Sequence, residues 1–194
     1  MQACQKSGIN VFPWMDTFVP DIVTLDPATP HRFEKLLETF GESYLSDIRD
    51  RYWIHLGGRA LKVFRPLYSP LSCDEILAKA DAGCAPELGD TSHFHMDLNK
   101  KFVPGLCAGL GIDAEDLENP LEPAAYPVLT TLAGDGIRGL FDYAASTHGF
   151  AGTRKTYISK CDLCNDIRYF LFSKGMCLNE LTPAGYYKEK KQHE

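Results

Sequence analysis

The sequence has no long apolar run, no excess of basic residues and no leader-like start. Every apolar stretch falls short of the roughly 20 residues that a membrane-spanning helix needs. Lysine and arginine number 20 against 26 aspartate and glutamate residues, a net charge of −6, so the basic surface that non-specific nucleic-acid binding requires is missing. The opening MQACQKSGIN lacks the basic start and apolar core of a signal peptide. We therefore expect a cytoplasmic protein that binds neither membrane nor nucleic acid.

The composition is that of a folded domain. With 194 residues, 44% of them apolar and 11% aromatic, the chain can bury a core as one domain, or as one domain with a small appendage. Its seven cysteines are odd in number and unevenly spread. A secreted disulfide framework would have an even number in a shorter chain, so the cysteines favour metal or redox chemistry.

The hydrophobic pattern predicts several helices and one hairpin. Helices are expected over residues 30–40, 44–48, 74–83, 124–147 and 156–174, the fourth interrupted by the glycines at 134–136. Residues 92–99 alternate with the period of a strand, and the apolar run 102–112 would form the second arm of a hairpin. We expect an α+β fold, with a small β-hairpin or sheet packed among helices.

Four cysteines have the positions of metal ligands. Cys161 and Cys164 are three residues apart near the start of a predicted helix, where both thiols share one face and the helix dipole favours thiolate. Cys107 lies between Gly105 and Gly109, and Cys84 follows a helix-ending glycine. Four thiolates suit zinc or a cubane cluster, so we expect a four-cysteine metal site that ties the fold together. Burial of Cys84 and Cys107 as small hydrophobic residues is the alternative.

Six motifs together resemble a known family. They are WMDTF (14–18), RYWIHLGGRAL (51–61), ELGDTSHFHMDL (87–98), PGLCAGLGI (104–112), KCDLCNDIRYFL (160–171) and ELTPAGYY (180–187). Their order resembles the C-terminal half of certain bacterial radical S-adenosylmethionine proteins, where a catalytic partial barrel precedes a cysteine-bearing extension similar to the SPASM and twitch auxiliary-cluster domains. The resemblance implies a 4Fe-4S cluster held by Cys84, Cys107, Cys161 and Cys164.

The sequence departs from that family in one decisive respect. The C-x3-C-x2-C loop that binds the catalytic cluster and S-adenosylmethionine is missing, so the chain alone is not expected to generate a radical. The resemblance instead implies an accessory cluster domain that supports electron transfer or substrate seating for a radical S-adenosylmethionine catalytic domain or subunit, acting on an unknown substrate. Residues 1–72 would be a helical segment continuing a missing N-terminal barrel, and 73–194 the cysteine-ligated auxiliary-cluster domain.

Other readings of the same residues remain open. A non-enzymatic, zinc-stabilised binding module could use the same four thiolates, and a chain that binds no metal is a third hypothesis. His93, His95 and Asp97 alternate along one predicted strand and have the residue types of a two-histidine, one-carboxylate metal triad. Alternate side chains on a strand stand in a row roughly 7 Å apart, which is a poor geometry for such a triad. Packing or hydrogen bonding beneath the cluster loop is the favoured role for these three. Arg59 would reach an anionic group or form a structural ion pair.

Overall fold

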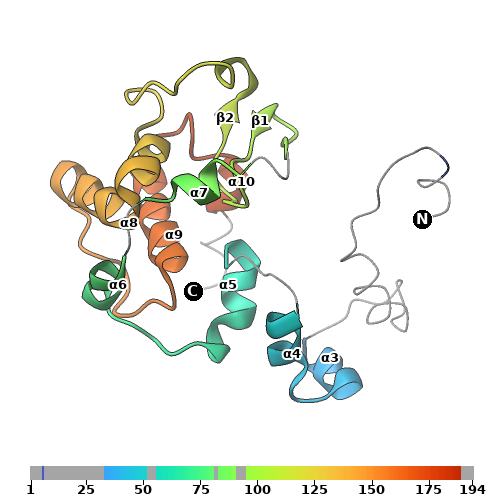
Figure 1. The fold of residues 1–194 in the computed structure, drawn as a ribbon. Helices are drawn as coiled ribbons and strands as arrows, with labels where there is room; N and C mark the ends of the chain where they lie inside the picture. The colour runs from blue at the N-terminus through green and yellow to red at the C-terminus, as the bar shows by residue number, and fades with distance from the viewer. Residues whose placement is uncertain (1–5, 7–32, 52–55, 81–82, 91–94, 189–194) are drawn as a thin grey trace. The chain divides into compact units, whose positions relative to one another are not determined.

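The computed structural model describes residues 6, 33–51, 56–80, 83–90 and 95–188 (Figure 1). Contacts divide the chain into two units, residues 1–54 and 55–194, and each is described by itself. The division expected from the sequence, 1–72 and 73–194, assumes that the first segment continues a missing N-terminal barrel. That division stays a prediction. No helix among the described residues is long and apolar enough to cross a membrane.

The described part of the first unit consists of two short helices. Helix α3 (Phe33–Phe40) ends at Gly41, which has a φ of 96° and donates its N–H to the carbonyl of Leu37. Helix α4 (Tyr44–Arg51) follows directly, and the rings of Phe40 and Tyr44 stack with centroids 4.5 Å apart. The predicted end of the first helix at Gly41 is confirmed, and its predicted start at residue 30 lies outside the described residues.

The second unit contains the remaining elements. In chain order they are α5 (Gly58–Phe64), the 3₁₀ turn η1 (Arg65–Leu67), α6 (Cys73–Lys79), α7 (Ala85–Leu88), β1 (Lys101–Phe102), β2 (Ile112–Asp113), the 3₁₀ turn η2 (Ala114–Asp116), α8 (Pro127–His148), α9 (Lys160–Ser173) and α10 (Ala184–Lys188). Helices and a small antiparallel sheet thus occur together, so the α+β class is confirmed.

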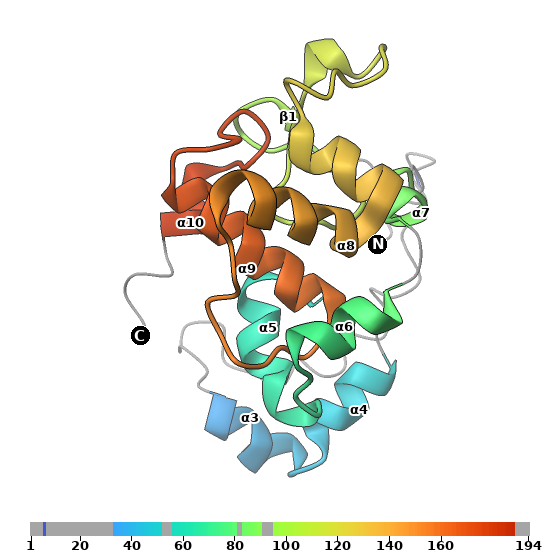
Figure 2. The same cartoon turned by 90° about the vertical axis from the view of Figure 1, so that its left-hand side faces the viewer.

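The core of this unit lies where α8 packs against α9, which run side by side in both views (Figure 2). Leu140 of α8 and Leu163, Ile167 and Leu171 of α9 are fully buried. Removing a leucine or isoleucine side chain from water stabilises a fold by about 1.5–3 kcal/mol. The contact between α8 and α9 therefore fixes the position of α9, which carries two of the four candidate ligands.

The predicted hairpin is present, with shorter strands than expected. Met96 forms an antiparallel bridge with Phe102, as expected for a turn between the two predicted arms. The ladder itself pairs Lys101 with Asp113 and Phe102 with Ile112, so β1 has its partner in β2. The residues between β1 and β2 form a loop because the glycines at 105 and 109 adopt positive φ angles.

Several helix boundaries differ from the predicted ones, two of them by four residues. Helix α6 ends at Lys79, not at residue 83, and α9 begins at Lys160, not at residue 156. Ser159 sets the second boundary, since its extended backbone and side-chain oxygen form the N-cap of α9. Helix α8 is interrupted at Gly136, within the predicted glycine break.

Candidate metal centre

The four predicted cysteines line one cavity of the second unit, whose volume is about 40 Å³. Cys84 is the N-cap residue of α7, Cys107 lies in the loop between β1 and β2, and Cys161 and Cys164 lie in the first turns of α9. All four are partly buried and none is in a disulfide. The cavity exceeds the roughly 10–15 Å³ that one water molecule needs. Three separate segments thus converge on one space bordered by thiols.

Cys84 and Cys107 are held by backbone contacts. The N–H of Cys84 donates to the carbonyl of Leu132 in α8 at 2.7 Å, and the N–H of Leu110 donates to the carbonyl of Cys107 at 3.1 Å. Gly105, with a φ of 54°, lies so close to the carbonyl of Glu87 that a Cβ there would collide with backbone. Glycine at this position therefore lets the Cys107 loop approach α7, which begins just after Cys84.

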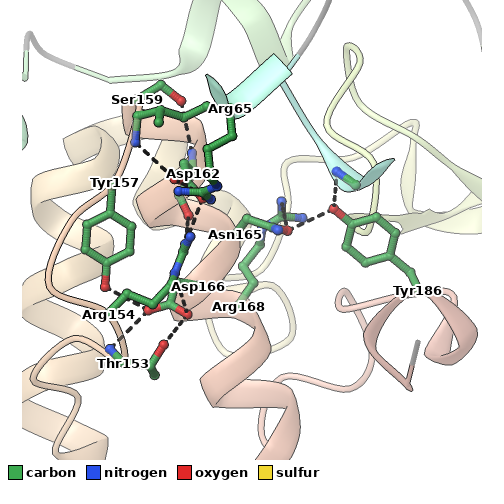
Figure 3. A network of polar contacts seen from close by, with 12 residues as sticks. Arg65, Thr153, Arg154, Tyr157, Ser159, Asp162, Asn165, Asp166, Arg168 and Tyr186 are labelled. Carbon is green, nitrogen blue, oxygen red and sulfur yellow. Dashed lines mark hydrogen bonds and ion pairs between the residues drawn. The ribbon is translucent and has the colours of Figure 1, made fainter. Parts of the chain in front are cut away.

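The start of α9 is held by a buried carboxylate, Asp162 (Figure 3). Its oxygens accept two hydrogen bonds from Arg65 Nη2, at 3.0 and 2.9 Å, and one from Arg154 Nη2 at 2.7 Å. The N–H of Ile158 donates to the same carboxylate at 3.0 Å, while the N–H of Asp162 donates to Ser159 Oγ at 3.2 Å. These bonds fix the helix turn on which Cys161 stands.

A second buried carboxylate, Asp166, secures the segment that leads into α9. It accepts hydrogen bonds from the N–H and hydroxyl of Thr153 and from the hydroxyl of Tyr157, the last at 2.8 Å. Arg154 Nε lies 3.8 Å from it. These hydrogen bonds tie α9 to the segment that precedes it.

The thiols are electrostatically coupled. Burial, followed by the neighbouring thiol of Cys164, raises the pKa of Cys107 to about 12, with smaller effects of the same sign from Cys161 and Cys84 and an opposing effect of Arg168. Burial and Cys164 likewise raise the pKa of Cys161 to about 11. Ionising several thiols in one partly buried space is costly because like charges repel and water is excluded. A bound cationic centre would remove that cost.

Arg168 brings a buried positive charge to the same cavity. Its Nη1 donates to the carbonyl of Ala108 at 2.8 Å and to the hydroxyl of Tyr187 at 3.3 Å, and its Nη2 donates to Asn165 Oδ1 at 3.3 Å. Asn165 Oδ1 also accepts from the hydroxyl of Tyr186 at 2.8 Å (Figure 3). Within the described part of the chain, Arg168 Nε has no hydrogen-bond partner.

The donor set fits an iron–sulfur cluster in type and number. Four cysteine thiolates are the usual ligands of a 4Fe-4S cluster, each on a different iron. Among the described residues, which include these four cysteines, no group of three or more histidine, cysteine or acidic side chains is placed to hold a metal ion. The four-cysteine metal site that ties the fold together therefore stays a prediction. The four thiols border the cavity, and the unpartnered Nε–H of Arg168 is a buried donor suited to a sulfur-rich anion.

The remaining predicted residues lie elsewhere or outside the described residues. His93 is outside them, His95 is exposed, and Asp97 accepts hydrogen bonds from the N–H groups of Asn99 and Lys101 in the hairpin turn. Of the described residues, neither His95 nor Asp97 borders the cavity. Arg59 lies in α5, and its side chain is not among those described.

Sequence reasoning missed Asp162, Arg65 and Arg154 as the residues that hold the C-x-x-C turn. A signal for the first was present, because Ser159-x-x-Asp162 has the spacing of a helix N-cap followed by an acid in the first turn. The two arginines carried no signal, since they come from segments before α6 and after α8.

Comparison of the chain with protein-family models, with curated proteins and with solved structures finds no match.

Proposed function

We propose that the second unit binds one 4Fe-4S cluster through Cys84, Cys107, Cys161 and Cys164. The observation that carries this proposal is the convergence of these four thiols, from three separate segments, on a single cavity. A structural thiol needs only apolar neighbours, whereas Cys84, Cys161 and Cys164 lie near enough to Cys107 to add to the effect of burial in raising its pKa.

The surroundings of the cavity support a cluster that stays in place. Leu88, Leu110, Leu132 and Ile137 also line the cavity and make much of its wall apolar. Cys84 and Cys107 are held by backbone hydrogen bonds, and Cys161 and Cys164 lie on α9, which packs against α8. The positions of the four candidate ligands are therefore set before the cluster binds. When bound, such a cluster would supply one-electron transfer.

The wider role follows from the sequence resemblance. The chain would be an accessory iron–sulfur domain of a radical S-adenosylmethionine enzyme, supporting electron transfer or substrate seating. The radical chemistry would belong to a partner domain or subunit that carries the C-x3-C-x2-C loop, which this chain lacks. The resemblance therefore predicts a coding sequence for such a loop in frame with this chain or adjacent to it.

Anaerobic reconstitution of the full chain with iron and sulfide tests the proposal. We expect about four irons per chain, a brown absorbance band and an electron paramagnetic resonance signal after reduction. The double variant Cys161→Ser/Cys164→Ser should lose most of the iron. The matched control Cys73→Ser/Cys177→Ser removes two thiols that do not line the cavity and should keep it.

Three results would contradict the cluster. A colourless protein with one zinc per chain after anaerobic isolation would favour the zinc-stabilised binding module. Equal iron loss in the two double variants would show that the four thiols are not the ligands. A protein that takes up no metal, and whose thermal stability a chelator leaves unchanged, would be a domain that binds none.

A further inference from the structure

Two basic side chains border the four-cysteine cavity among the described residues, Lys160 and Arg168. Only Arg168 is buried, with 5% of its surface exposed. Its guanidinium group is held by acceptors from three segments: the carbonyl of Ala108 next to Cys107, the hydroxyl of Tyr187 in α10 and Asn165 Oδ1 in α9. The planar group therefore has one fixed orientation. Both terminal nitrogens are in use in that orientation.

The third guanidinium nitrogen, Nε, takes part in none of these hydrogen bonds. Arg168 Nε is buried and has no acceptor among the described residues, although a buried N–H without a partner destabilises a fold. Arg154 Nε is also without a hydrogen bond, but it lies 3.8 Å from the carboxylate of Asp166. No carboxylate contacts Arg168 within the described part of the chain, so its charge faces thiols and phenols instead.

The signs of the charges suit an anionic ligand. Four thiolates around a 4Fe-4S core with a charge of +2 give a net charge of about −2, and a one-electron reduction adds another negative charge. Arginine keeps its proton at every accessible pH, so Arg168 supplies one permanent positive charge to this partly buried space. Coulombic attraction to the reduced centre is stronger than to the oxidised one.

We propose that the Nε–H of Arg168 donates a hydrogen bond to a sulfur of the cluster or of its cysteine ligands, and that the arginine charge raises the reduction potential of the centre. This rests on the proposed function, because it requires the cluster to bind. It assigns Arg168 as a positioning and tuning residue of the centre. The reaction concerned is a one-electron reduction by an external donor such as dithionite, in which no bond breaks and Arg168 keeps its proton.

Redox titration of the reconstituted full chain tests the tuning. In Arg168→Gln the ratio of oxidised to reduced cluster, measured at the wild-type midpoint potential, should rise at least tenfold, which for a one-electron couple corresponds to about 59 mV. Arg168→Lys keeps the charge and should recover part of that shift. Arg138→Gln removes the same charge from an exposed position of α8 and should leave the midpoint unchanged.

The wild-type protein tests the hydrogen bond without any variant. With ¹⁵N-labelled arginine, pulsed electron paramagnetic resonance of the reduced cluster should detect coupling to an arginine nitrogen. A purely structural Arg168 would change iron retention and thermal stability but would give neither that coupling nor a shifted midpoint.

The two proposals fail in different ways. Absence of iron in the wild-type chain would overturn the proposed cluster. A wild-type chain with four irons and no arginine coupling would overturn the inference about Arg168 alone. The same conclusion would follow if Arg168→Gln carried four irons and titrated at the wild-type midpoint.

Discussion

Glu180 is a fully buried carboxylate that joins the C-terminal segment to the start of α8. Its two oxygens accept hydrogen bonds from the N–H groups of Val128 and Leu129, at 2.7 and 2.8 Å. Burial raises its pKa to about 7, although both hydrogen bonds act in the opposite direction. The folded state therefore binds the Glu180 proton more tightly than the unfolded chain does.

That difference predicts a loss of stability as the pH rises. Between the ordinary glutamate pKa and about 7 the folded state holds more protons than the unfolded state, so the free energy of unfolding falls through this range, by up to about 3 kcal/mol. Glu180→Gln stays neutral and should lack this component. Urea unfolding of both proteins at pH 4.5 and 7.5 measures it, and an equal pH dependence in the two would contradict the prediction.

Asp162 should be essential for the stability of the C-x-x-C turn. Asp162→Asn removes the charge that pairs with Arg65 and Arg154, whose side chains are 39% and 30% exposed and can be partly rehydrated. We expect a loss of about 2–3 kcal/mol in the free energy of unfolding, below the value for a wholly buried pair. The variant should also bind less iron, because Cys161 precedes Asp162 directly.

The control for that prediction is Asp142→Asn, on an exposed position of α8, which should change the free energy of unfolding by less than about 0.5 kcal/mol. Chemical denaturation and iron analysis compare the two variants. Equal stability of Asp162→Asn and the wild type would show that the ion pairs contribute nothing.

Residue type and spacing were enough to single out the four cysteines. The structure brings the four cysteines to one cavity, while their ligation of a metal stays a prediction. The burial of Asp162 and Glu180 could not be foreseen, because a charged side chain is ordinarily exposed and only its tertiary partners make burial tolerable.

At the scale of elements, the kink of α8 depends on one glycine. Gly136 has φ 63° and ψ −152°, a conformation that residues with a Cβ avoid, whereas Gly134 is helical and a Cβ there would meet nothing within 4 Å. Gly136→Ala should therefore lower the free energy of unfolding by about 1–3 kcal/mol. Gly134→Ala should raise it by about 0.5–1 kcal/mol. Thermal or urea unfolding of the pair measures both signs, and a stabilising Gly136→Ala would show that the kink is dispensable.

The same helix shows why boundaries were harder to predict than elements. The glycines at 134–136 indicated an interruption, but not that it would place both Leu132 and Ile137 on the cavity. The hairpin was recognised from alternation, yet the partner of Phe102 in the ladder is Ile112, since pairing depends on the loop that Gly105 and Gly109 shape. Local patterns fix the type of an element more firmly than its register.

For the whole molecule, the hydrophobic core and the four cysteines belong to one unit. The main cluster of buried apolar residues lies within residues 55–194, and so do all the residues that border the cavity. No linker between two domains was recognisable in the sequence, because the residues before 55 carry no composition shift that marks a boundary. The expected division at residue 72 rested on family resemblance, and α5 belongs to the second unit.

A fragment of residues 55–194 should therefore fold and bind the cluster without residues 1–54. Its core helices α8 and α9, and the segments that hold the cysteines, make their described contacts within the fragment. We expect a single cooperative urea transition, a free energy of unfolding within about 1–2 kcal/mol of the same transition in the full chain, and the same iron content per chain. Circular dichroism and iron analysis of both proteins, reconstituted in parallel, measure this.

A fragment that lacks a cooperative transition would show that residues 1–54 supply contacts the second unit needs. One that folds but takes up no iron, while the full chain binds four, would place part of the centre before residue 55.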